Sequence, residues 1–195
     1  RPGLGGQGDG NGFTEPAVEA GLDFFSRIQA PDGHWSLDQA PKGISADEFG
    51  PGSMQADTAA TGLVLLTYFG AGYTHLDEKH RDVVRRGVRW LIQHQKPDGD
   101  LFTGGSRVTH FYSQGIAAMA LCEIYGMTQD PDLREPAQKA VQYIIATQDP
   151  SGGGWRYEPR QESDTSVTGW QLMAMKSAQM AGLDVPEEPF EKIRG

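Results

Sequence analysis

Two kinds of helical pattern alternate along the chain. Residues 57–72, 110–126 and 164–182 are apolar over most of their circumference, which is typical of helices packed between other helices. Residues 21–29, 87–95 and 140–148 instead place apolar side chains on one face and polar side chains on the other. No stretch shows the two-residue alternation of a half-buried strand. The pattern therefore predicts an all-α fold built from helical hairpins, each with one amphipathic and one buried helix.

The two patterns form an internal repeat. Gly62, Gly115 and Gly169 occupy one position of the buried helix, 53 and 54 residues apart. Each amphipathic helix ends in a glutamine followed by a turn rich in Pro, Asp and Gly: Gln29, Gln95 and Gln148. The first repeat carries an insertion within residues 36–55, which we interpret as either a binding loop or lid, or tolerated decoration.

The ends of the chain differ from the repeats. Residues 1–13 are Gly-rich without apolar periodicity and are predicted to be a flexible linker. Residues 186–195 resemble the start of a further amphipathic helix. We therefore expect one domain over residues 14–195, with three hairpins and the start of a fourth, truncated within that repeat.

The turns and helix ends resemble the prenyltransferase and squalene oxidase repeat, the QW-type motif of triterpene cyclases and protein prenyltransferase β-subunits. The residues that carry the resemblance are Gly21, Gln29, Gly33, Trp35, Arg86, Gly87, Trp90, Leu91, Gln95, Gly99, Gln148, Gly152 and Trp155. The stretch from residue 151 onward looks like uncharacterised bacterial repeat proteins of the same terpenoid cyclase superfamily. The resemblance implies a partial α/α toroid, about half a ring, with the buried helices inside and the amphipathic helices outside.

The repeated Gln and Trp residues are interpreted as structural. A buried Gln can bond the orphan N–H groups at the start of the next helix, and a Trp can pack over the turn. A motif that recurs once per repeat is typical of solenoid packing rather than of a catalytic centre.

Three polar residues share the first position of the buried helices. These are the candidate catalytic residues Asp57, His110 and Asp164, which a toroid would gather on one rim of its cavity. For the two Asp residues we prefer an N-cap role, because Asp is among the best capping residues and the helix dipole favours a carboxylate there. A His is a weaker cap, so His110 is the candidate base or ligand.

The sequence lacks the catalytic motifs of both families that it resembles, the triterpene cyclases and the protein prenyltransferases. Triterpene cyclases protonate an alkene with an Asp-x-Asp-Asp cluster, whereas the corresponding stretches here are residues 55–58 and 162–165, QADT and ESDT. Protein prenyltransferases use a zinc site that includes Cys, but Cys122 lies in an apolar run and is interpreted as core packing. We therefore expect no metal and no cofactor.

A glycan-binding cleft is a third hypothesis, because aromatic and acidic side chains gather near the last buried helix. The residues that would suit this cleft are Trp155, Tyr157, Glu158, Glu162 and Asp164. The candidate ligand-binding residues of the chain are Tyr112, Trp155, Tyr157, Glu162 and Trp170. The alternative, which we prefer, is that Trp155 closes the repeat turn and the charges are solvated.

Charge and composition limit the classes of partner and the kinds of protein that fit this sequence. The chain has 17 Lys and Arg against 26 Asp and Glu, a net charge of -9 that repels phosphate backbones and excludes nucleic acid as a partner. No apolar run approaches the roughly 20 residues that span a bilayer. We expect a soluble segment of a larger bacterial protein, with no compartment assigned.

Two functions remain. The first is a non-catalytic binding or scaffolding module whose inner surface holds an apolar small molecule, a glycan or a protein. The alternative is a terpenoid- or glycan-active enzyme that uses the rim. An open half-ring also predicts a homodimer or dependence on further C-terminal repeats.

Overall fold

The computed structural model describes residues 14–41, 43–45, 47, 50 and 52–194, and these contain helices and no strand. The helices are α1 (Thr14–Ile28), α3 (Asp57–Gly70), α4 (Arg81–His94), α5 (His110–Thr128), α6 (Pro131–Ala146), α7 (Thr165–Met180) and α8 (Glu188–Arg194), with a short 3-10 turn at Arg107–Thr109. The prediction of an all-α fold is confirmed. None of these helices combines the length and the apolar character needed to cross a membrane. The predicted linker, residues 1–13, lies outside the described residues.

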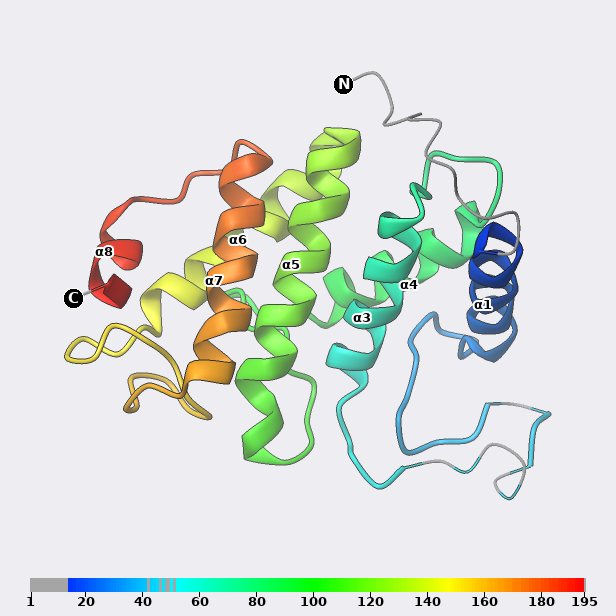
Figure 1. Ribbon diagram of the computed structural model, residues 1–195, viewed down its shortest axis with the longest axis horizontal. Helices are drawn as coiled ribbons and strands as arrows, with labels where there is room; N and C mark the ends of the chain where they lie inside the picture. Colours follow the sequence, from blue (N-terminus) through cyan, green and yellow to red (C-terminus); the bar gives the residue numbers. More distant parts are fainter. Residues whose placement is uncertain (1–13, 42, 46, 48–49, 51, 195) are drawn as a thin grey trace.

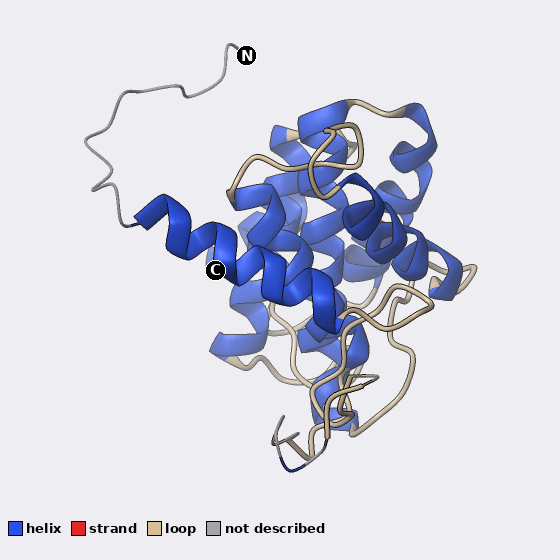
Figure 2. Cartoon of the chain, turned by 90° about the vertical axis from the view of Figure 1, so that its right-hand side faces the viewer, coloured by secondary structure: helices blue, strands red, loops and turns tan. Residues whose placement is uncertain are grey.

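The helices form an inner row and an outer row, as a toroid-like arrangement requires. α5 packs between α3 and α7, and the N-terminal ends of these three inner helices point to the same side, the lower side of Figure 1. α4 packs against α3, and α6 packs against both α5 and α7. Figure 2 shows α1 as the outermost helix at the near end of the array. Along the chain each outer helix is followed by an inner one, in the pairs α1–α3, α4–α5 and α6–α7, and a fourth pair that begins with α8 stays a prediction.

The repeated glutamine joins each hairpin to the next. In all three turns its Nε2 donates a hydrogen bond to a carbonyl near the start of the following outer helix. The acceptors are Val83 O for Gln29 at 3.0 Å, Pro136 O for Gln95 at 2.9 Å and Pro189 O for Gln148 at 2.9 Å. The expectation of a bond to orphan N–H groups is therefore wrong. The amide nitrogen bonds the backbone of the helix, and a backbone carbonyl has a second lone pair to accept it. In the first turn the amide oxygen also accepts a hydrogen bond from the side chain of Arg86 on α4.

Candidate functional site

The N-terminal ends of the inner helices form a rim that carries the three candidate catalytic residues. Asp57 is the first residue of α3, His110 is the first residue of α5, and Asp164 is the N-cap residue of α7. Because the three helices lie side by side with the same direction, the rim has the arrangement that the repeat implied. The surroundings of the three side chains nevertheless differ.

Asp164 caps α7. Its Oδ1 accepts hydrogen bonds from the backbone N–H groups of Ser166 at 3.0 Å and Val167 at 3.1 Å. The Ser166 hydroxyl donates to the same oxygen at 2.6 Å, and this bond, followed by the backbone bonds, lowers the pKa of Asp164. Asp164 Oδ1 is engaged as a cap, which agrees with the preferred N-cap role.

Asp57 does not cap α3, and the capping interpretation is wrong for this residue. Ala56 occupies the N-cap position, because the chain enters the helix with Asp57 already in helical conformation, and no side chain caps α3. Asp57 Oδ1 is buried without a hydrogen-bond partner among the described residues. Oδ2 lies 3.8 Å from Nε2 of His34. Asp57 therefore keeps one carboxylate oxygen available for another group.

His34 lies between two carboxylates. Its Nδ1 bonds Asp32 Oδ1 at 2.6 Å, and its ring lies against Trp90 with 5.3 Å between the ring centroids. Burial acts to raise the pKa of Asp32, but the hydrogen bonds from His34 and from the Trp90 indole lower it overall. These contacts fix the direction of the imidazole and place it beside Asp57.

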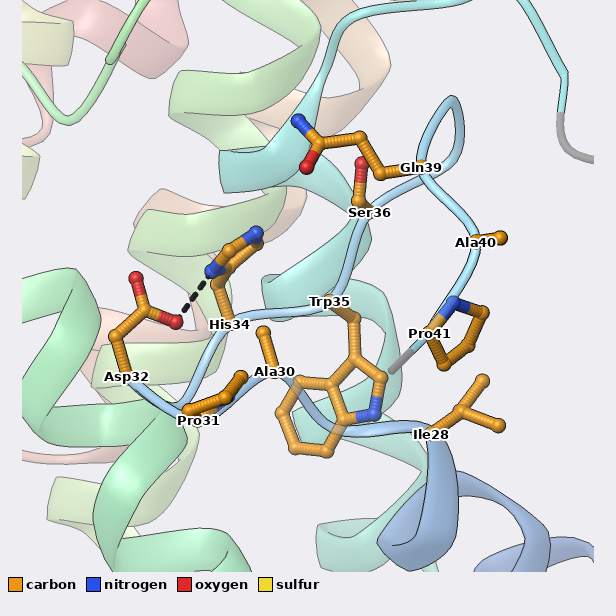
Figure 3. A pocket seen from close by; sticks show the side chains of 10 residues that line it. All are labelled: Ile28, Ala30, Pro31, Asp32, His34, Trp35, Ser36, Gln39, Ala40 and Pro41. Carbon is orange, nitrogen blue, oxygen red and sulfur yellow. Dashed lines mark hydrogen bonds and ion pairs between the residues drawn. The ribbon is translucent and has the colours of Figure 1, made fainter. Parts of the chain in front are cut away.

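Two hollows lie near the rim, one lined by Asp57 and the other by His34, and both are partly lined by the insertion. The first, about 200 Å³, is lined by Asp38, Gln39, Gln55, Ala56, Asp57 and residues 103–105. The second, about 420 Å³, has the turn residues on one side and Gln39–Pro41 on the other (Figure 3). Gln39 lines both hollows. The inserted residues thus build walls beside the rim, which favours the binding-loop interpretation over decoration.

His110 belongs to a second histidine–carboxylate pair. Its Nε2 lies 3.1 Å from Asp100 Oδ1 and 3.4 Å from the Tyr143 hydroxyl, and its ring stacks on Phe102. Asp100 is 4% exposed, and its other oxygen pairs with Lys96 Nζ at 2.7 Å. Burial acts to raise the pKa of Asp100, but the bonds from His110, Lys96 and the Phe102 backbone lower it overall. His110 is therefore already engaged with a buried anion.

The two pairs occupy equivalent repeat positions with the partners exchanged. In the first repeat the histidine, His34, follows the turn and the carboxylate, Asp57, begins the inner helix. In the second repeat Asp100 follows the turn and His110 begins the helix. The third repeat has Gly154 after the turn and no side chain there to pair. Sequence reasoning missed His34 and Asp100 because it compared only the first position of the inner helices. A comparison of the residue after each turn glycine would have found them.

The predicted ligand-binding residues differ in what they contact. Trp155 is 1% exposed, and its indole N–H donates to Ile144 O at 2.8 Å, so the structure places it in the core instead of on a ligand surface. The Tyr112 hydroxyl lies 2.5 Å from Ser166 Oγ at the rim. Tyr157 packs against the core and Glu162 is exposed. A ligand role for these last three residues stays a prediction.

A mostly buried apolar cluster lies between the inner helices next to the rim. A small cluster joins α3, α5 and α7, with these members: Ala56, Ala59, Leu66, Ile116 and Trp170. Leu63 and Met173, one helical turn from Leu66 and Trp170, are 41% and 43% exposed. Because Ala56 directly precedes Asp57, this cluster lies beside the carboxylate, and Leu63 and Met173 extend it to the solvent.

No protein-family model matches the chain. Over 175 residues it is 25% identical to a drimenyl diphosphate synthase of Streptomyces showdoensis, a match that covers 85% of this chain and 32% of the synthase. The chain thus spans about a third of the length of the curated relative it matches. The distant similarity and the all-helical fold together fit the terpenoid cyclase superfamily.

Proposed function

We propose that this chain is part of a terpenoid-active enzyme whose inner helices hold an isoprenoid hydrocarbon and whose chemistry takes place at the start of α3. The observation that carries the proposal is the buried, unpartnered carboxylate oxygen of Asp57 beside the apolar cluster of the inner helices. A buried acceptor without a partner costs free energy, so its presence calls for an explanation, and a role toward a substrate supplies one. The similarity to a drimenyl diphosphate synthase supports the terpenoid class. No observation on the described residues favours the scaffolding function over it.

Asp57 is the catalytic residue in this proposal, and His34 with Asp32 positions it. Cyclisation of an isoprenoid moves positive charge along a hydrocarbon. A carboxylate at the wall of an apolar site stabilises that charge, because little water screens the interaction. The same carboxylate acts as a general base when the carbocation loses a C–H proton and the C–H electron pair forms the product alkene.

Turnover of isoprenyl diphosphates tests the proposal. The purified protein is incubated with geranyl, farnesyl and geranylgeranyl diphosphate. The products are then treated with a phosphatase and identified by gas chromatography and mass spectrometry. We expect a cyclised product from the unchanged protein and a loss of about 100-fold or more for Asp57→Asn. Asp164→Asn is the matched control, because Asn also caps helices well and the rim charge changes equally.

Two results would overturn the proposal. Full activity of Asp57→Asn would remove Asp57 from the chemistry. A folded protein that neither binds nor converts any isoprenyl diphosphate would refute the terpenoid function itself, and a glycan panel under the same conditions would then test the other substrate class.

A further inference from the structure

A histidine and two carboxylates meet where α1 lies near the loop that precedes α4. Glu19 and Asp23 are one turn apart on α1 and share a face of that helix. His80 is the residue before α4. One ligand atom from each of the three residues lies within 4.8 Å of the others, and His80 Nε2 is 3.6 Å from Glu19 Oε2. None of these residues belongs to the rim or to the proposed terpenoid chemistry.

The His80 ring is held rigidly. Its side chain is 7% exposed, and its backbone has φ 60 and ψ 6, the left-handed region that non-glycine residues seldom adopt. The ring lies edge-on to Tyr68 and Tyr73, with centroid distances of 5.2 Å and 4.9 Å. Contacts with neighbouring residues hold this buried ring on a backbone conformation that is unfavourable by itself, which is typical of functional positions.

The hydrogen bonds around His80 leave one ring nitrogen without a partner. Nδ1 lies 3.4 Å from Ser26 Oγ, and Ser26 Oγ directs its own hydrogen to Leu22 O at 3.0 Å. Ser26 Oγ also lies 2.9 Å from the Tyr68 hydroxyl. A hydroxyl has a single hydrogen, so when Ser26 directs it to Leu22 O or to Tyr68, Ser26 accepts from Nδ1–H and neutral His80 has its lone pair on Nε2. Nε2 is buried and has no hydrogen-bond partner among the described residues. In this tautomer the lone pair faces Glu19 Oε2 at 3.6 Å, and a cation between the two atoms would satisfy both.

We propose that His80, Glu19 and Asp23 bind a divalent transition-metal ion of the zinc class. Zinc takes imidazole nitrogen and carboxylate oxygen ligands at about 2.0–2.2 Å, which places neighbouring ligand atoms of a tetrahedral site roughly 3.3 Å apart. The 3.6 Å between His80 and Glu19 is close to that spacing. An Asp23 oxygen lies within 4.8 Å of both ligand atoms and would move closer to complete a three-ligand set. Water fills the fourth position in sites of this kind. The ion would fasten α1 to the loop before α4.

Lys79 competes for the same carboxylate. Its ammonium pairs with Glu19 Oε2, and the Tyr73 hydroxyl donates to Oε1 at 2.5 Å. The Lys79 side chain is 50% exposed and can turn into solvent when an ion enters. Removal of Lys79 should therefore strengthen metal binding.

Metal titration tests the site without reference to activity. The tag-free, metal-free protein is titrated with Zn²⁺ by calorimetry and with Co²⁺ by visible absorption, and its melting temperature is followed in parallel. We expect one ion per chain, a higher melting temperature with zinc, and affinity about tenfold or more weaker in Glu19→Gln and His80→Asn. Asn tolerates the left-handed backbone at position 80, so this variant keeps the turn. Lys79→Met should bind more tightly than the unchanged protein, and His94→Ala, which removes an exposed histidine of α4, should bind equally.

Three results would overturn the proposal. Equal zinc affinity in the unchanged protein, Glu19→Gln and His80→Asn would place the ion elsewhere. Absence of binding at micromolar zinc in both the unchanged protein and Lys79→Met would leave the cluster as an ion pair between Glu19 and Lys79. Weaker zinc binding in Lys79→Met would show that Lys79 does not compete with the ion.

Discussion

At the residue scale, two carboxylates at equivalent rim positions differ in their contacts. Asp164 accepts two backbone N–H groups, whereas Asp57 caps nothing and keeps a buried oxygen unpaired. We expect Asp164→Ala to lower the free energy of unfolding by about 1 kcal/mol. Asp57→Ala should leave it unchanged or raise it, because the substitution removes an unsatisfied acceptor. Urea unfolding of both variants measures the difference, and an equal loss at both positions would contradict it.

Asp100 makes the stability of the second repeat depend on pH. Its folded-state pKa lies below the ordinary value of 3.8, so the unfolded chain binds the proton more readily. The ionised carboxylate therefore stabilises the fold above that value and loses this contribution as the pH falls through the folded pKa. We expect Asp100→Asn to melt at a lower temperature than the unchanged protein at neutral pH, with the gap narrowing in acid. Melting curves that stay parallel from neutral pH into acid would show that Asp100 titrates alike in both states.

At the element scale, each turn abuts the outer helix of the next hairpin so closely that it needs glycine. Gly99 has φ 98, and a Cβ placed on it would lie 2.1 Å from Lys139 O. Gly72 has a similar φ of 87 but open space around it. Gly72→Ala therefore isolates the backbone strain and should cost about 1–2 kcal/mol. Gly99→Ala adds a clash with backbone and should cost about 3 kcal/mol or more, measured by denaturant unfolding. Equal losses of unfolding free energy in the two variants would mean that the Gly99 turn can move away from the next outer helix at no cost in stability.

The helices can be predicted from local sequence patterns, but the side-chain pairs that form between distant segments cannot. The apolar run over residues 110–126 predicts a buried helix, and α5 covers His110–Thr128, because burial on all sides leaves a signature within one segment. The pairing of His34 with Asp57 leaves none, since the insertion decides how the two residues meet. The cap of α3 was mispredicted for a related reason: the N-cap position depends on the backbone conformation of Ala56, which the residue types do not fix. The left-handed conformation of His80 is equally invisible in the sequence.

At the scale of the whole molecule, the inner helices leave an apolar surface uncovered within the described part of the chain. Leu63 on α3 and Met173 on α7 are its most exposed members next to the rim cluster. Apolar surface of this kind is buried by a second copy, by further repeats or by a ligand. We expect the chain to self-associate as its concentration rises in sedimentation experiments. The double variant Leu63→Lys, Met173→Lys should remain monomeric, with its free energy of unfolding within about 0.5 kcal/mol of the unchanged value, because both side chains are partly solvated.

Val18 provides the matched control for this surface. It is 51% exposed on α1, at the outer end of the array, so Val18→Lys adds a charge of the same sign without touching the inner face. Self-association should persist in this variant. If the inner face is also where an isoprenoid binds, a prenyl diphosphate analogue should dissociate the unchanged protein and Val18→Lys alike, because the ligand and the second copy compete for one surface. Association that Val18→Lys abolishes and the inner-face variant retains would assign the contact to the outer helices instead, and would leave the apolar inner surface free for substrate.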